Sequence, residues 1–557
     1  MCGLFFVFAA TAFAGGSPTR RTVPMLEGTK AEISLTPIAE VWLEGGFFAV
    51  QVKVDNRSEA AQSWSIQFTS ERTYRQKLTF TKEINVGPRS SLETIVLVPG
   101  SGVPFASRIT TLGALVVGPW VERSNLNLTN FNSNVLRQVA TSASQEVALF
   151  AAISAASGGG ATSGPGSSGP GGSNDQVELS VVDAAAWPAD WRVWSPFTLV
   201  VMTDPEFRAL DGARRAALLD WVALGGTLSL FPPFTQGSSL IPAENWGRGG
   251  IIRSEKTLAE VASPESLLPK APKFPRQLFD QAIMAGNSSG PQAFELSSGS
   301  IGVTLFLVLF ALLIGPVNLL LFAPAKSRQR LFFTVPLISL GASLVLGLVI
   351  VWRDGFGGEG VQRGLIMLLP GENKAVVVQY QLSCTGVLFS GAFPLPEDTQ
   401  CIFSYEPLRT LPHLSFDTRE RNFARFGTTL SGDWFASRQR QQQILQRITP
   451  TRARVELVDG GGKTGSPPVV QSSVGAPLRE FRYRDSARRL WGADEVVPGR
   501  KVVLSELPSG WPDLPSGDFL ARTGASELAP LPTLSSIRWN EPVFFITGRV
   551  ESPKSTL

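Results

Sequence analysis

Apolar and polar residues alternate in short runs over the first part of the chain. The runs "FFAVQVKVDN", "WSIQFTS", "KLTFTKEINV" and "LETIVLVPG" have a period of two, and the turn-forming clusters 55–58 and 87–90 separate them. A period of two places every second side chain on the same face of a strand, which is typical of a sheet with one buried face. We therefore predict an antiparallel, immunoglobulin-like β-sandwich over residues 15–130.

The pattern changes over residues 131–290, where the apolar runs become continuous. "VELSVVD", "FTLVVMTD" and "TLSLF" are interspersed with the helix-like run "GARRAALLDWVAL". Strands that are buried on both faces and alternate with helices are typical of a parallel sheet covered by helices. We predict such an α/β domain, with Gly225 and Gly226 ending the helix and the Gly/Ser-rich insert 157–174 acting as a flexible tether.

Two longer apolar stretches, 301–322 and 331–352, contain no charged residue. Each is long enough to cross a bilayer as a helix, and the short connection between them predicts an antiparallel transmembrane hairpin. Lys326, Arg328 and Arg330 lie in the connection 323–330, and short loops rich in Lys and Arg remain in the cytoplasm. We therefore expect a two-pass protein of the bacterial inner membrane with both large arms in the periplasm.

Pro316 and Asn318 interrupt the first stretch. The Asn318 amide either bonds to a neighbouring helix of a partner or bonds locally to backbone groups that Pro316 leaves free. Neither stretch contains an ionisable residue, which argues against an ion path through this chain alone. Trp352, at the end of the second stretch, suits a membrane–water interface.

The arm after the hairpin, 353–557, is again rich in short apolar or alternating runs and predicts further β structure. Within it, the segment 433–448, "DWFASRQRQQQILQRI", has the composition of a helix. From Arg419 to Arg454 there are eight arginines against Glu420 and Asp433. One interpretation of this excess of positive charge is a surface that contacts anionic lipid headgroups, envelope polymers or an acidic partner. The other is a solvated helix face with scattered surface charge.

Residues 1–14 predict a signal peptide, because an apolar run too short to span a membrane ends in the small-x-small pattern Ala12-Phe13-Ala14. The alternatives are a short uncleaved anchor and a buried apolar start. An exported chain retains Cys384 and Cys401, which are either a disulfide pair or two unrelated buried thiols. Their surroundings have none of the cysteine or histidine spacings of a metal site.

Composition narrows the possible functions. Charged residues make up 17% of the chain, below the ~25% of soluble domains, and the net charge is only +4, so neither a wholly soluble chain nor a nucleic-acid partner is indicated. No cofactor motif is present, and the single histidine, His413, lacks the surroundings of a catalytic triad.

Asp204 and Glu206 follow a predicted strand, where α/β folds bind ligands, although the same residues suit a turn into a helix.

The segment "WPADWRVWSPFTLVVMTDPEFRALDGARRAALLDWVALGGTLSLF" resembles the central part of class I glutamine-amidotransferase-like domains. With "IGPVNLLLF", "RLFFTVP", "DWFASRQ" and the run from 472 to 504, the chain resembles uncharacterised bacterial envelope proteins. The resemblance implies a multidomain α+β membrane protein with a β-sandwich, a flavodoxin-like amidotransferase-like domain, a membrane hairpin and a C-terminal β-rich arm. Active amidotransferases need a cysteine and a histidine together, and the α/β segment has neither.

These features predict a non-enzymatic, membrane-anchored periplasmic scaffold or binding module without a cofactor, whose partners are the lipid bilayer and other envelope proteins. Two alternatives remain open. One is an accessory subunit of a membrane transport complex, with Pro316 and Asn318 at the helix contact. The other is an enzyme of unrecognised type that uses the α/β domain.

Overall fold

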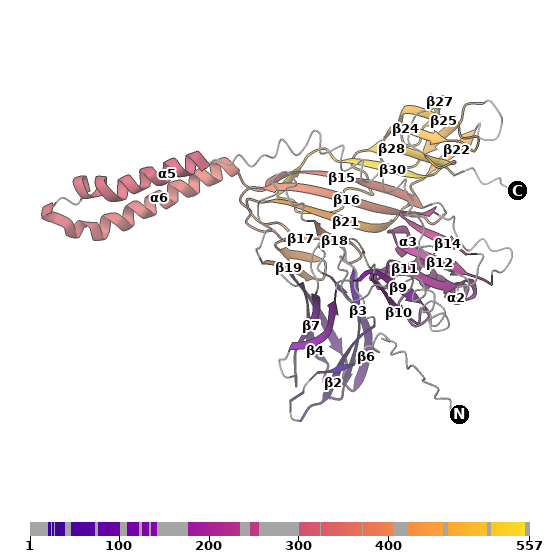
Figure 1. The fold of residues 1–557 in the computed structure, drawn as a ribbon, viewed down its shortest axis with the longest axis horizontal. Helices are drawn as coiled ribbons and strands as arrows, with labels where there is room; N and C mark the ends of the chain where they lie inside the picture. The colour runs from indigo at the N-terminus through magenta and orange to yellow at the C-terminus, as the bar shows by residue number, and fades with distance from the viewer. Residues whose placement is uncertain are drawn as a thin grey trace, which may run out of the picture.

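The computed structural model consists mainly of β-sheets, from which a pair of long helices projects on one side (Figure 1). The residues that the structure describes are 20–23, 25–26, 28–38, 46–72, 76–100, 109–121, 125–132, 135–141, 176–233, 245–254, 300–322, 325–369, 371–404, 420–459, 466–508 and 514–551.

Two sheets packed face to face form the N-terminal sandwich. The first contains β1 (Arg21–Thr22), β2 (Ala31–Pro37), β3 (Phe47–Asn56) and β6 (Ser90–Pro99), and the second contains β4 (Gln62–Arg72), β5 (Gln76–Val86), β7 (Ile109–Val117) and β8 (Asn125–Asn132). Because apolar and polar residues alternate, the apolar face of each strand points into the core. Val50, Trp64 and Phe68 are among its fully buried side chains. The β structure predicted for this region is therefore present.

The second sandwich sheet is completed by strands from the far side of the hairpin. β19 (Arg421–Phe426) runs parallel to β5, with Ala424 opposite Thr79. β20 (Thr429–Gly432) and β17 (Phe393–Pro394) extend the sheet further, and we call this composite the shared sheet. The two arms that the sequence suggests as separate units are therefore joined by backbone hydrogen bonds.

The α/β unit contains a parallel sheet in the order β10-β9-β11-β12-β14, with β13 antiparallel at its edge. Counted along the chain this order is 2-1-3-4-5, which occurs in doubly wound α/β folds. Its elements are β9 (Val135–Thr141), β10 (Gln176–Val181), η2 (Trp191–Trp194), β11 (Leu199–Thr203), α2 (Asp204–Ala209), α3 (Gly212–Ala223), β12 (Thr227–Phe231), β13 (Asn245–Trp246) and β14 (Gly249–Arg253).

Gly225 and Gly226 end α3 as predicted. Gly225 has a φ of 122°, and its N–H donates to the Val222 carbonyl while that of Gly226 donates to the Trp221 carbonyl. A side chain on Gly226 would meet the Trp221 ring. Gly225 is required for its backbone conformation, and Gly226 is required because the Trp221 ring approaches it closely.

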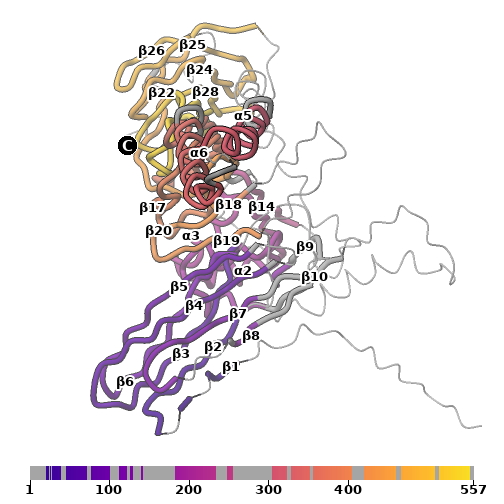
Figure 2. Tube along the Cα trace, turned by 90° about the vertical axis from the view of Figure 1, so that its left-hand side faces the viewer, coloured from indigo at the N-terminus to yellow at the C-terminus, as the bar shows by residue number. Residues whose placement is uncertain are grey.

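A sheet of long strands dominates the C-terminal arm, and we call it the long sheet. Its strand order is β18-β21-β16-β15-β30-β28-β24-β25-β27, with β29 beside β15. The strands are β15 (Gly358–Leu369), β16 (Lys374–Thr385), β18 (Gln400–Ser404), β21 (Arg440–Pro450), β24 (Leu478–Arg484), β25 (Leu490–Val496), β27 (Ser505–Glu506), β28 (Asp518–Thr523), β29 (Ile537–Trp539) and β30 (Val543–Arg549). A smaller sheet of β22 (Val455–Asp459), β23 (Val469–Ser472) and β26 (Lys501–Val503) adjoins it, and Figure 2 shows this region and the sandwich at opposite ends of the body.

The helix predicted over 433–448 is wrong. Residues 440–450 form strand β21, which lies between β16 and β18 in the long sheet. Gln, Arg and Leu favour helices only weakly, and pairing on both edges overrides that preference. The strand alternates buried Gln441, Gln443 and Leu445 with more exposed neighbours, a period of two.

The projecting helices form an antiparallel hairpin. It consists of α5 (Ser300–Leu312), the π-helical segment η6 (Leu313–Phe322), the 3₁₀ segment η7 (Ala325–Arg330) and α6 (Leu331–Asp354). Within the described residues, two helices, over 304–322 and 328–349, are long and apolar enough to cross a membrane. Large apolar side chains such as Leu320 and Phe332 are exposed along them.

One apolar core joins the α/β unit to the rest of the body. It brings Trp194 and Leu218 of the α/β unit together with Phe47 of β3 and Leu365 of β15. At the sandwich contact, the Phe47 and Trp191 rings meet edge to face at 5.8 Å, and the Phe47 N–H donates to the Ser195 hydroxyl at 2.7 Å. This core thus joins the α/β unit to the first sandwich sheet and to the long sheet.

Candidate functional site at the junction of the sheets

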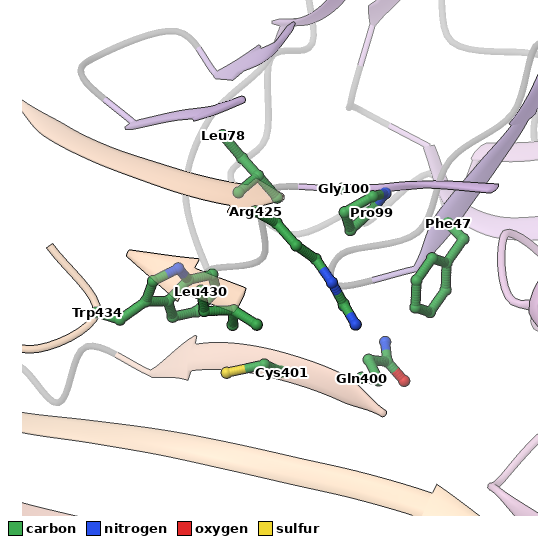
Figure 3. Close-up of a pocket in the computed structure, with 9 residues that line it drawn as sticks. All are labelled: Phe47, Leu78, Pro99, Gly100, Gln400, Cys401, Arg425, Leu430 and Trp434. Atoms are coloured by element: carbon green, nitrogen blue, oxygen red, sulfur yellow. The ribbon is translucent and has the colours of Figure 1, made fainter. Parts of the chain in front are cut away.

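A small cavity lies where the shared sheet, the first sandwich sheet and the long sheet meet (Figure 3). Its volume is about 10 Å³, room for roughly one water molecule. The lining residues come from both sides of the hairpin and are Phe47, Leu78, Pro99, Gly100, Gln400, Cys401, Arg425, Leu430 and Trp434. The cavity therefore marks the seam between the two halves of the chain.

Arg425 of β19 is the charged group at this seam, and its side chain points into the cavity region. It is only 5% exposed, and its guanidinium donates to the backbone carbonyls of Pro396 at 2.8 Å, Gly427 at 3.2 Å and Thr399 at 3.4 Å. Burial lowers the pKa of Arg425 below its ordinary value, although an arginine remains charged at physiological pH. A buried cation bound by three carbonyls fastens loop 396–399 to the shared sheet.

A second arginine crosses the same seam from the α/β unit. Arg192 is held by the Asp190 carboxylate at 2.6 Å, lies 5.5 Å from the Phe47 ring centroid, and donates to the Glu397 carbonyl at 2.9 Å. The loop that contains Glu397 is therefore bound by arginines from two different units. This arrangement suits a structural fastening and offers little room for a substrate.

The structure has no disulfide between Cys384 and Cys401, which favours the interpretation of two unrelated thiols. Cys384 pairs with Arg440 and Cys401 with Leu445, on opposite edges of β21. Five residues along a strand correspond to about 17 Å, far beyond the ~7 Å limit between Cα atoms of a disulfide. Burial raises the pKa of the Cys401 thiol, which makes it a poor nucleophile.

A row of glutamines crosses the long sheet beside this seam. Gln362 of β15, Gln381 of β16 and Gln443 of β21 lie opposite one another in register and are almost fully buried. The Gln381 amide donates to Gln443 Oε1 at 3.1 Å, and the Gln443 amide donates to the Trp434 carbonyl at 2.6 Å. Sequence reasoning missed this row, although the spacing of two between glutamines in "VQYQLS" and "RQQQIL" was a usable signal.

Asp204 and Glu206, the predicted ligand-binding acids, lie at the carboxyl end of β11 as expected. Both carboxylates are already bound within the chain. Asp204 is fully buried and accepts from Arg208 at 2.5 and 3.2 Å, and Glu206 accepts from the Thr203 N–H and hydroxyl, each at 2.8 Å. Together with the Thr203 cap they start helix α2, as in the turn-into-helix interpretation.

Four of the arginines between 419 and 454 are engaged in separate contacts. Arg425 is buried, Arg447 pairs with Asp398, and Arg454 pairs with Glu456. Arg421 lies over the Phe403 ring at 4.8 Å. Of the two interpretations offered by the sequence, these contacts match scattered side chains.

In the hairpin, Lys326, Arg328 and Arg330 all fall in η7, the connection between the helices, and the latter two are exposed. Pro316 and Asn318 lie in the π-helical segment. The Asn318 side chain is fully buried, and neither its nitrogen nor its oxygen has a hydrogen-bond partner. The local bond to backbone freed by Pro316 is therefore not made.

A second, open hollow of about 530 Å³ lies at the tip of the β24–β25 hairpin and is lined by Arg484, Arg488, Arg489, Leu490, Glu506, Leu507 and Pro508. Asp485 anchors this tip by accepting from the Trp491 indole at 3.0 Å and from Arg489. Burial acts to raise the pKa of Asp485, but these hydrogen bonds outweigh it and lower the pKa below its usual value. Within the described part of the chain, no group of His, Cys, Asp or Glu is arranged to hold a metal ion.

Several predictions lie outside the described residues. These are the signal peptide 1–14, the insert 157–174 and His413.

No protein family and no curated protein matches the chain. Among solved structures, a putative ApaA protein from Bordetella pertussis is 17% identical, with 21% of this chain and 87% of that chain covered and a TM-score of 0.11. A β-glucuronidase from Bacteroides uniformis is 14% identical, with 37% of this chain and 23% of that chain covered and a TM-score of 0.13. The matched part is thus about a quarter of the glucuronidase, and similarities this weak say nothing about function.

Proposed function

We propose that the chain is a membrane-anchored scaffold or binding module of the bacterial envelope, with both halves of its body in the periplasm. The pairing of β19 with β5 carries this proposal. These strands lie on opposite sides of the hairpin in the sequence, and they can pair only when both arms are in the same compartment. The cations of η7 at the opposite end of the hairpin then face the cytoplasm, in agreement with the positive-inside rule.

A scaffold role is supported by the contacts of the side chains that could otherwise take part in catalysis or ligand binding. Asp204, Glu206 and Arg425 are engaged in bonds that hold the body together, and the Cys401 thiol is kept protonated by burial. The resemblance to envelope proteins with an amidotransferase-like domain fits the 2-1-3-4-5 strand order, because that order is typical of flavodoxin-like folds. We infer a body built for rigidity and for contact with partner proteins.

Paired cysteines test the shared compartment. In a chain with Cys384→Ser and Cys401→Ala, the changes Thr79→Cys and Ala424→Cys place two thiols side by side across β5 and β19. We expect a disulfide to form in intact cells, because the periplasm is oxidising. The control pair Thr79→Cys with Val503→Cys, which lie in different sheets, should not cross-link. Absence of the 79–424 bond, together with protection of both arms from protease in spheroplasts, would refute the topology.

The transport-subunit alternative is supported by one observation, the unpaired Asn318 amide in the hairpin. An amide without a partner in hydrocarbon is costly, and a neighbouring helix could supply its hydrogen bonds if the two helices separate slightly. In mild detergent, the wild-type chain should then retain a membrane partner that the Asn318→Leu variant loses. The matched variant Leu320→Ala, which alters an exposed position, should retain it.

A further inference from the structure

Two phenylalanine rings stand exposed on the body next to the hairpin. Phe389 is 90% exposed and Phe356 is 60% exposed, and their rings stack with centroids 5.2 Å apart and planes 18° from parallel. Aromatic side chains of this size are normally buried, and a stacked, exposed pair is an apolar patch that water solvates poorly. Such a patch marks a contact surface.

The pair is held rigidly. Phe356 and Val387 form a β-bridge, in which the Gly357 N–H donates to the Val387 carbonyl at 3.0 Å and the Val387 N–H donates to the Gly355 carbonyl at 2.9 Å. The Leu388 N–H donates to the Ser437 hydroxyl at 2.9 Å, and this bond further fixes the backbone next to Phe389. The rings are therefore presented by fixed backbone, which keeps the loss of conformational entropy on binding small.

The position of the pair identifies its partner. Helix α6 ends at Asp354, and Gly355, with a φ of 67°, turns the chain directly into Phe356. Two residues extend at most about 7 Å, so the rings lie at the foot of the membrane-spanning helix. If α6 crosses the bilayer, this level is that of the lipid headgroups, where aromatic side chains are favoured.

We propose that Phe356 and Phe389 insert into the membrane–water interface and hold the body against the lipid surface. The partner is the phospholipid bilayer at the boundary between headgroups and acyl chains. This inference rests on the proposed membrane anchor, and it adds a second attachment that limits tilting of the body about the hairpin. Burial of both rings in that boundary would remove their apolar surface from water.

The test uses the full chain without its native cysteines (Cys2→Ser, Cys384→Ser, Cys401→Ala), reconstituted into vesicles of phosphatidylethanolamine and phosphatidylglycerol. A single environment-sensitive NBD label is attached at Phe389→Cys, at Val503→Cys or at Leu344→Cys. Val503 and Leu344 are each 60% exposed, the former on the far part of the body and the latter in α6. Spin-labelled lipids, with the quencher at the headgroup or in the acyl chain, then report depth.

We expect headgroup spin labels to quench the label at position 389 several-fold more than the label at 503, while acyl-chain labels quench the label at 344. Equal and weak quenching at 389 and 503, with 344 still quenched, would overturn the inference and leave the anchor intact. Absence of quenching at 344 would overturn the anchor and the inference together. Circular dichroism of each labelled variant checks that the fold is retained, as expected for substitutions at exposed positions.

Discussion

The ammonium nitrogen of Lys374 lies 2.8 Å from both carboxylate oxygens of Asp220. Lys374 begins β16 of the long sheet and Asp220 lies in α3, so the ion pair ties the α/β unit to the C-terminal arm. Burial raises the pKa of the Asp220 carboxyl above its ordinary value, and the hydrogen bonds from Lys374 oppose that rise. The pair therefore compensates a carboxylate that the packing of α3 has partly removed from water.

Replacing Lys374 by Met should destabilise the body by about 2 kcal/mol near neutral pH, because Asp220 keeps its charge and loses its partner. Protonation removes that charge, so the loss should shrink as the pH falls. Thermal unfolding in detergent at about pH 7 and about pH 5 measures both effects. Adding Asp220→Asn to the variant should recover part of the stability, and an equal loss at both pH values would contradict this account.

Asp518, opposite Arg549 in β28 and β30, should make stability fall with rising pH. Burial raises the pKa of Asp518 to about 6 in the folded chain, against an ordinary value of 3.8, with Arg549 acting in the opposite direction. The folded chain thus holds this proton more tightly, and the resulting stabilisation is complete below pH 3.8 and lost as the pH rises through about 6.

The variant Asp518→Asn should therefore unfold at a higher temperature than the wild type at about pH 7.5, and the two should converge below about pH 4. Asp494→Asn provides a control at an exposed acid on β25. A difference between Asp518→Asn and wild type that did not vary with pH would exclude titration of this residue as the cause.

The glutamine row should behave as a coupled unit. Gln443→Leu leaves the Trp434 carbonyl and the Gln381 amide without their partner, which we expect to cost about 2 kcal/mol. Gln381→Leu should also destabilise the chain, but the double variant should cost less than the two single changes together. Denaturant unfolding of the four chains of this cycle gives the coupling energy, and simple additivity would show that the row is not a unit.

Cys384 and Cys401 should not be bonded to each other by a disulfide. Denatured without reductant, Cys384 and Cys401 should each take up one maleimide, and in the folded chain Cys401 should react slowly because burial raises its pKa. Mass spectrometry counts the labels at each peptide. If labelling required a reductant, the two cysteines would be disulfide-bonded and this prediction would be wrong.

The sequence was most informative where one physical signal dominates. Alternation in 47–56 predicted β3, and the charge-free stretches 301–322 and 331–352 predicted the helices of the hairpin, because one pattern extends over every residue of each segment. It failed at 433–448, where weak helix preference competes with pairing to β16 and β18.

Contacts between distant segments could not be predicted at all. Nothing in 76–86 indicates β19 as its neighbour, since parallel pairing depends on the fold of both arms. The location of Asp204 at the end of a strand was predicted correctly. Its carboxylate is bound by Arg208, four residues later, and this spacing of an ion pair within a helix can be recognised in a sequence. Arg425 binds backbone carbonyls of a distant loop, and the sequence does not indicate which carbonyls a side chain will meet.

The interleaving of β19 with β5 also bears on how the chain is made. In the proposed topology, the sandwich sheet has an unpaired edge at β5 until segment 421–426 has been synthesised and has crossed the membrane after the hairpin. An open strand edge invites pairing with other chains during this interval. The N-terminal sandwich can therefore be completed only after part of the C-terminal arm has been made. If the hairpin spans the membrane as proposed, its insertion becomes a step in the folding of the sandwich.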